Sequence, residues 1–303
     1  MKKKNISRKE FLEKSCAGIL AYGLTKNVPV QVAGEDKRNI AEYRTLGRTG
    51  IKVSSVGFGA SRTMEPSLVK IALDSGINFL DTGRAYYNGR NEIMIGKVLK
   101  GIRNKAVIQS KMQIRFRGKS IKNVLPGEIK KTMQSSLETS LKALQTDYID
   151  IMLIHGASDV ELIENETVMN FFSAAKEKGI IGTCGFSSHA NQIELLKTAN
   201  KTKFYDVIMV PYNHKGSYIH MNSGHYSEWD QTALEIELKK AHKNNIGLIA
   251  MKTTSGGPYS PDKKSKPTYK DALKWLLNHE YIHTMAVAMG NLDEINENIQ
   301  AMT

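Results

Sequence analysis

Residues 148–156 read YIDIMLIHG and residues 180–188 read IIGTCGFSS, two apolar runs that each end in polar residues. Both runs are short enough to be buried strands, and the segment around Phe171–Ala175 between them predicts a helix. An apolar strand, a helix and a second apolar strand form the unit of a parallel sheet covered by helices. The fold therefore depends on how far this unit repeats along the chain.

The alternation repeats eight times. The other expected strands are SSVGFGA (54–60), INFLDT (77–82), AVIQSK (106–111), VIMVPYN (207–213), GLIAMKT (247–253) and TMAVAMG (284–290). The other expected helices lie at 66–76, 91–101, 129–144, 193–196, 234–241, 272–276 and 292–302. Eight such units predict an α/β fold, a (β/α)8 TIM barrel over residues 43–303, and YRTLGRTGIKVS (43–54) predicts a β-hairpin before it.

An open, doubly wound sheet is the alternative architecture. Gly57-Phe58-Gly59 followed by Asp81 is similar to the fingerprint of a dinucleotide-binding fold. The position of the third glycine holds Arg62, however, and two glycines alone are a weak signal. The sequence therefore favours the barrel.

The composition excludes few functions. The net charge of +13 suits a phosphorylated cofactor or an anionic substrate as well as nucleic acid. Without a nucleic-acid-binding motif, no nucleic-acid partner is expected. No run of about eighteen apolar residues exists, so we expect no integral membrane association.

Residues 1–42 are interpreted as a signal-like or disordered N-terminal segment. They begin with three lysines, contain SRKEFL at residues 7–12 and reach a short apolar stretch. This order is typical of an export signal, and SRKEFL is similar to a twin-arginine motif in which Lys9 replaces the second arginine. We therefore expect a periplasmic or exported protein, with a basic N-terminal arm and a cytoplasmic location as the alternative.

Polar, ionisable residues follow three of the predicted strands. Asp81 ends the second strand and is followed in the next loop by a tyrosine, Tyr86 or Tyr87. Lys111 ends the third strand, and His155 ends the fourth. In a (β/α)8 barrel the active site lies at the carboxyl ends of the strands, so these four side chains are expected to meet there. Each of three residues also has a purely structural interpretation: Asp81 as a helix cap, Lys111 as a solvated strand end, and His155 as a histidine of the core.

Such a cluster suits proton exchange with a carbonyl or alcohol oxygen. A free tyrosine has a pKa near 10, which a neighbouring ammonium lowers, and a carboxylate can hold that ammonium in place. One of the two tyrosines, with Lys111 and Asp81, therefore predicts a proton donor and acceptor, and His155 can orient the same oxygen. Since no residue here transfers a hydride, a bound hydride carrier is implied.

These segments together resemble the aldo-keto reductase family, over residues 43–302. DTGRAYYNGRNE is similar to its Asp-Thr-x-x-x-Tyr segment, and the five-residue step from Asp81 in that segment implies Tyr86 rather than Tyr87 as the acid. VIQSK and DIMLIHG supply the matching Lys111 and His155. The resemblance implies reduction of a small aldehyde or ketone to an alcohol by NADP(H), with NAD(H) as the alternative cofactor.

The resemblance also implies a set of cofactor-binding residues. These are Gly59, Ser187, Ser188, Tyr212, Lys252, Glu294 and Asn298. Two departures stand out: Met209 lies where the family usually has a glutamine, and residues 288–298 contain no lysine or arginine. The alternative function is therefore a cofactor-binding barrel with little or no turnover. No metal is expected, and the cysteines of a related iron–sulfur group are missing.

Overall fold

The computed structural model describes residues 42–220, 224–262 and 264–302. The predicted signal-like segment lies outside these ranges, apart from Glu42, so export stays a prediction. No helix in the described ranges is both long enough and apolar enough to cross a bilayer.

Eight parallel strands close into a barrel in the order β11-β12-β3-β4-β5-β6-β7-β8. Their bounds are β3 (Val56–Gly59), β4 (Phe79–Asp81), β5 (Val107–Met112), β6 (Ile149–Ile154), β7 (Ile181–Ser187), β8 (Val207–Pro211), β11 (Gly247–Met251) and β12 (Thr284–Ala288). All eight coincide with the apolar runs identified above, and only β5 extends beyond its run, by one residue, to Met112. The predicted (β/α)8 barrel is confirmed.

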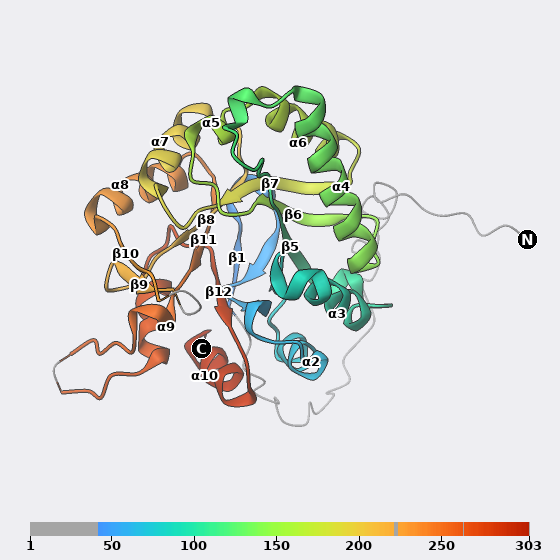
Figure 1. Cartoon of the computed structure of the whole chain (residues 1–303). Helices are drawn as coiled ribbons and strands as arrows, with labels where there is room; N and C mark the ends of the chain where they lie inside the picture. The colour runs from blue at the N-terminus through green and yellow to red at the C-terminus, as the bar shows by residue number, and fades with distance from the viewer. Residues whose placement is uncertain (1–41, 221–223, 263, 303) are drawn as a thin grey trace, which may run out of the picture. The chain divides into compact units, whose positions relative to one another are not determined.

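Helices surround the strands, which lie at the centre of Figure 1. They are α2 (Pro66–Asp74), α3 (Arg90–Val98), α4 (Pro126–Leu144), α5 (Val160–Ile163), α6 (Glu166–Glu177), α7 (Gln192–Thr202), α8 (Gln231–Lys243), α9 (Tyr269–Leu277) and α10 (Leu292–Met302). Local signals fix their starts: Pro66 and Pro126 occupy first turns, while Asn165, Asp230 and Thr268 accept backbone N–H groups as caps.

A hairpin closes the amino-terminal end of the barrel. It pairs β1 (Tyr43–Thr45) with β2 (Lys52–Ser54), as predicted. Leu46 and Val53 join the apolar cluster that fills the barrel interior, and the backbone N–H of Arg48 donates to the Asn245 carbonyl at 2.7 Å, just before β11. The opposite end of the barrel, formed by the carboxyl ends of the strands, is not covered by this hairpin.

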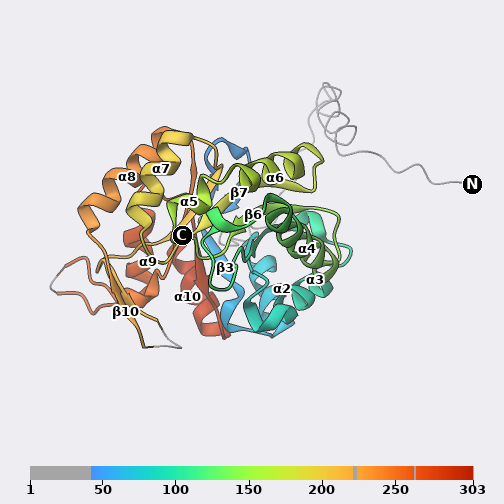
Figure 2. The ribbon, with the colours of Figure 1, turned by 45° about the horizontal axis from the view of Figure 1, so that its top comes forward.

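A second hairpin was not predicted. It pairs β9 (Ser217–Ile219) with β10 (Tyr226–Glu228) after β8. Ile219 and Tyr226 are exposed, and only Tyr218 is buried. Strands that are mostly exposed do not need the apolar run by which the barrel strands were found. Figure 2 shows β10 beside the barrel, below α8 and α9 in that view.

Candidate active site

The four residues predicted to form the site come together at the carboxyl ends of the strands. Asp81 is the last residue of β4, Lys111 lies on β5, His155 follows β6, and Tyr86 begins a 3-10 turn after β4. All four line one cavity of about 710 Å³. This placement agrees with the general rule that the active site of a (β/α)8 barrel lies at the carboxyl ends of its strands.

The hydroxyl of Tyr86 lies between an ammonium and a carboxylate. Lys111 Nζ lies 3.0 Å from Tyr86 Oη, donates to Oδ1 of Asp81, and donates to the Thr82 carbonyl at 2.9 Å. Tyr86 Oη lies 3.5 Å from Asp81 Oδ2, at the limit of a hydrogen bond. Because Lys111 is fully buried, Asp81 supplies the opposite charge that its ammonium requires.

The pKa of Tyr86 is raised, whereas the sequence predicted that Lys111 would lower it. Burial and the negative charge of Asp81 raise the pKa of Tyr86, and the lowering effect of Lys111 does not outweigh them. Burial alone would lower the pKa of Lys111, but Asp81 and Tyr86 raise it overall. The free protein therefore holds a neutral phenol beside a charged ammonium.

His155 is a neutral imidazole. Burial, followed by the charges of Lys111, His189 and Arg115, lowers its pKa to about 3. Its ring packs edge-on against the ring of Tyr86, with the centroids 5.9 Å apart. Its Nδ1 is buried without a partner in the described part of the chain. The site thus presents a phenol and a neutral imidazole side by side.

A buried network fixes the loop that carries Tyr86. Glu92 on α3 is fully buried, forms an ion pair with Arg84 and accepts from the Ser110 hydroxyl at 2.6 Å. The Thr82 hydroxyl donates to Asn91 at 2.6 Å. These contacts tie the loop after β4 to α3 and β5. They explain why Tyr86 is held against Lys111 although it lies outside regular strands and long helices.

Three of the predicted cofactor-binding residues line the cavity: Gly59, Ser187 and Lys252. Gly59 also has a packing role, because a β-carbon there would lie 2.9 Å from the backbone of Val287. Ser187 is buried and its hydroxyl accepts from the Gly156 N–H at 3.1 Å. These residues therefore line the same cavity as Tyr86.

Lys252 is an unusual cation. Its backbone has a φ of +57°, a left-handed conformation that most side chains avoid. Its ammonium lies 5.1 Å from the centroid of the Tyr218 ring, and burial lowers its pKa. Within residues 42–220, 224–262 and 264–302 it forms no ion pair with an acid. A partly desolvated cation of this kind is suited to bind an anion.

Two predicted residues are turned away from the cavity. The inward side of β8 carries Val207 and Met209, so Tyr212 falls on the outer side. Its hydroxyl contacts Glu235 at 2.9 Å and Tyr281 at 2.7 Å beneath α8 and α9. Ser188 is buried, with its hydroxyl bonded to the Ala190 carbonyl. The alternation of side chains along β8 could have revealed the outward position of Tyr212.

Glu294 and Asn298 lie on α10 and are absent from the cavity wall. The Glu294 carboxylate accepts from the Gly290 N–H at 2.7 Å, which ties the helix to the loop after β12. Asn298 is buried on the same helix. The structure therefore places both residues on α10, and neither lines the cavity that contains Tyr86.

Sequence reasoning missed several residues of the cavity wall. They include Ser61, Arg62, His189, His220, Met251, Thr253, Thr254 and Ser255. Burial lowers the pKa of His189 to about 4, so it also stays neutral at ordinary pH. Most of these residues belong to loops, where no periodicity marks the side that faces the barrel mouth.

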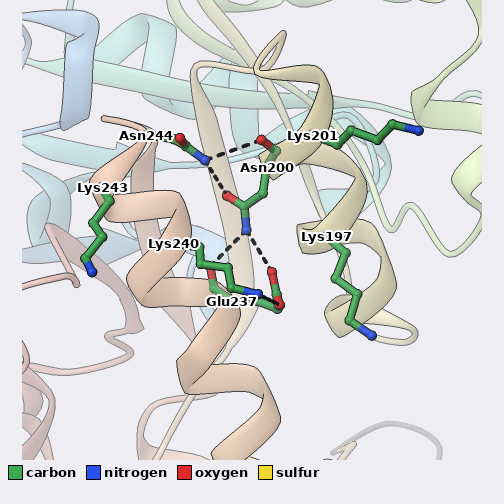
Figure 3. A pocket seen from close by; sticks show the side chains of 7 residues that line it. All are labelled: Lys197, Asn200, Lys201, Glu237, Lys240, Lys243 and Asn244. Carbon is green, nitrogen blue, oxygen red and sulfur yellow. Dashed lines mark hydrogen bonds and ion pairs between the residues drawn. The ribbon is translucent and has the colours of Figure 1, made fainter.

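A different hollow lies between α7 and α8, on the outside of the barrel (Figure 3). Four lysines border it: Lys197, Lys201, Lys240 and Lys243. Its central groups satisfy one another, since the Asn200 amide donates to Glu237 at 3.0 Å and Lys240 pairs with the same carboxylate at 2.7 Å. This arrangement joins α7 to α8.

Comparisons with known proteins agree with this geometry. The model of the aldo/keto reductase family matches residues 59–272. L-galactose dehydrogenase from Arabidopsis thaliana is 26% identical over 309 residues, which cover 86% of this chain and 88% of that protein.

Two solved structures show the same fold. An aldo-keto reductase from Bacillus halodurans, in its holo form, has a TM-score of 0.67 and 23% identity, covering 86% of this chain and 90% of that one. An aldo/keto reductase from Klebsiella pneumoniae, in complex with NADP and acetate, has a TM-score of 0.63 and 18% identity, covering 86% and 89%. With the family model spanning well over half of its residues and the barrel in agreement, this chain belongs to the aldo/keto reductase family.

Proposed function

We propose that this protein reduces an aldehyde or ketone to the alcohol, with hydride from a nicotinamide cofactor and a proton from Tyr86. The observation that carries the proposal is the placement of the Tyr86 hydroxyl on the cavity wall, 3.0 Å from the ammonium of Lys111 and beside the ring of His155. Family membership supports carbonyl reduction in general.

Each residue has a distinct part in this reaction. The raised pKa of Tyr86 keeps its proton in place until the carbonyl oxygen becomes basic enough to take it. As the proton leaves, the phenolate is stabilised by Lys111, which Asp81 holds in position. Neutral His155 can donate its N–H to the same oxygen. When bound, a nicotinamide cofactor would supply the hydride that, together with the proton from Tyr86, converts the C=O group to CH–OH.

The cavity suits a nicotinamide dinucleotide in part. Ser187 offers a hydroxyl on the wall, and Lys252 offers a cation without an acidic partner in the described residues. Met209 also lines the wall, and its thioether cannot replace the hydrogen bonds of an amide side chain. Residues 288–298 provide no basic group for a 2′-phosphate. We therefore propose NADP(H) or NAD(H), with Lys252 as the main phosphate contact.

A second candidate function is a barrel that binds the cofactor with little turnover. Met209 and the lack of lysine and arginine in residues 288–298 favour it, because both remove contacts that would keep the cofactor in the orientation needed for hydride transfer. The two candidates make the same prediction for cofactor binding and opposite predictions for catalysis.

The test uses the full chain and separates binding from turnover. Fluorescence titrations with NADPH and NADH measure binding, and oxidation of the bound cofactor after addition of aromatic and aliphatic aldehydes measures catalysis. Saturable binding with multiple turnovers supports the reductase. Binding without turnover supports the second candidate, and the absence of binding by either cofactor contradicts both.

A further inference from the structure

The cavity that contains Tyr86 has a neighbour. A second cavity, of about 900 Å³, lies between the loop after β5 and the segment after β6. His155 lines both cavities, so it forms part of the wall between them. A substrate whose carbonyl oxygen reaches Tyr86 and His155 is therefore in contact with a residue that also borders this second space.

The second cavity contains cations that lack acidic partners. Arg115, Arg117 and Lys119 line it, and none of them forms an ion pair within the described ranges. Two acids also line it. Glu161 is neutralised by Lys122 at 2.5 Å, and Asp159 accepts from the Ser158 hydroxyl at 3.2 Å. The uncompensated charge in this space is therefore positive.

Of the three cations that line the second cavity, Arg115 is the one placed beside Gly156 and His155. A β-carbon placed on Gly156, the residue after His155, would lie 3.4 Å from Nη2 of Arg115. Arg115 is also among the charges that lower the pKa of His155, which places its guanidinium within electrostatic reach of that ring. An arginine fork can bind a carboxylate or a phosphate through two parallel hydrogen bonds.

The second cavity also has an apolar part. Ile114 and Leu162 are buried, Phe116 and Ile121 are half-buried, and all four line the second cavity. These side chains favour an apolar stem between the carbonyl group and the charged group. A small polar aldehyde would leave this surface uncovered.

We propose that the substrate is a carbonyl compound with an apolar stem and an acidic terminus, a carboxylate or a phosphate, that binds Arg115 in the second cavity. This inference rests on the proposed reductase function and adds a substrate class to it. Arg117 and Lys119 raise the positive potential at the same opening and attract the acid as it approaches.

The experiment compares three benzaldehydes that differ at the para position. 4-Carboxybenzaldehyde and 4-formylphenyl phosphate carry the two acidic groups, and 4-formylbenzamide is the neutral analogue. A second set of three compounds has two additional methylene groups between the ring and the terminal group. These longer compounds test whether a greater separation between the carbonyl group and the acid is needed to reach Arg115. The variants are Arg115→Gln and, as the control, Lys130→Gln, which removes an exposed charge from α4 away from the cavity.

We expect the wild-type protein to prefer an acid over the amide by about tenfold in kcat/KM, mainly through KM. Arg115→Gln should remove most of this preference, and Lys130→Gln should keep it. The larger of the two acidic preferences identifies carboxylate or phosphate as the terminus. Equal kcat/KM for all three aldehydes in the wild type, or an equal loss in the two variants, would overturn the proposal.

Failure of the reductase function gives a different result. If no aldehyde is reduced, calorimetric titration with terephthalate and with phenyl phosphate still tests the anion site. Binding that Arg115→Gln weakens and Lys130→Gln preserves would support the site in a barrel without turnover. No binding of either anion by the wild type would contradict it.

Discussion

The side-chain amide of Gln109 and the carboxylate of Asp81 are joined by a hydrogen bond of 2.6 Å inside the barrel. Gln109 lies opposite Asp81 in the sheet register, two residues before Lys111 on β5. Its Nε2 also lies 3.4 Å from the sulfur of Met209, and its Oε1 has no partner in the described residues. Oδ1 of Asp81 therefore accepts from both Gln109 and Lys111, and Gln109 holds the carboxylate from the interior.

Replacing Gln109 should disturb this alignment. In Gln109→Leu, Asp81 loses one of the two donors to Oδ1, and we expect kcat to fall about tenfold with a small change in KM. Ile151→Val is the control, because Ile151 is the register neighbour of Gln109 and fills the same interior without a hydrogen bond. Steady-state kinetics measure kcat for both variants. An equal loss of kcat in the two would mean that Gln109 contributes by packing alone.

Removing the phenol oxygen tests the proton donor. Tyr86→Phe should lower kcat/KM by a factor of about 10² to 10⁴, the usual contribution of a general acid, while the fluorescence titration with cofactor stays nearly unchanged. Tyr87→Phe is the matched control, since Tyr87 lines the cavity but forms no hydrogen bond with Lys111 or Asp81. Retained activity in Tyr86→Phe would contradict the assignment.

The pH dependence follows from the two shifted groups. Reduction needs the proton on Tyr86, whose pKa is raised above 10, so kcat/KM should fall only as the pH rises through that high value. His155 has a pKa of about 3 and stays neutral above it. We therefore expect a flat profile between about pH 5 and pH 9. A limb near pH 6.5 would show that His155 titrates in its ordinary range.

Lys252 should contribute to cofactor binding. Lys252→Met removes the cation on the cavity wall and should weaken binding of NADPH and NADH by about tenfold or more. Lys243→Met is the control, because Lys243 borders the hollow between α7 and α8. Fluorescence titration measures both, and equal affinities in the two variants would place the cofactor phosphates away from Lys252.

Barrel closure depends on close contact between β7 and β8. A β-carbon at Gly185 would lie 1.8 Å from the carbonyl oxygen of Val207, so Gly185→Ala should lower the free energy of unfolding by about 3 kcal/mol or more. Gly127→Ala is the control, because nothing lies within 4 Å of its added carbon. Thermal unfolding followed by circular dichroism compares them, and matching melting temperatures would contradict this packing argument.

The sequence by itself determined the barrel and the four central residues. Apolar runs and helical spacing are local properties, so all eight strand positions could be assigned before any contact was known. Asp81, Lys111 and His155 were found because each follows an apolar strand, and parallel strands in a barrel end on one face. Gln109 shares a strand face with Lys111 and could have been found by the same period of two.

Only the tertiary structure decided the electrostatics and the second cavity. The pKa of Tyr86 depends on burial by loops distant in sequence, which outweighs the effect of Lys111 that the spacing suggested. The approach of Arg115 to Gly156 depends on two loops from different strands, and no periodic pattern links them. Strand positions follow from local repeats, but desolvation and the meeting of loops follow from how the closed barrel brings remote segments together.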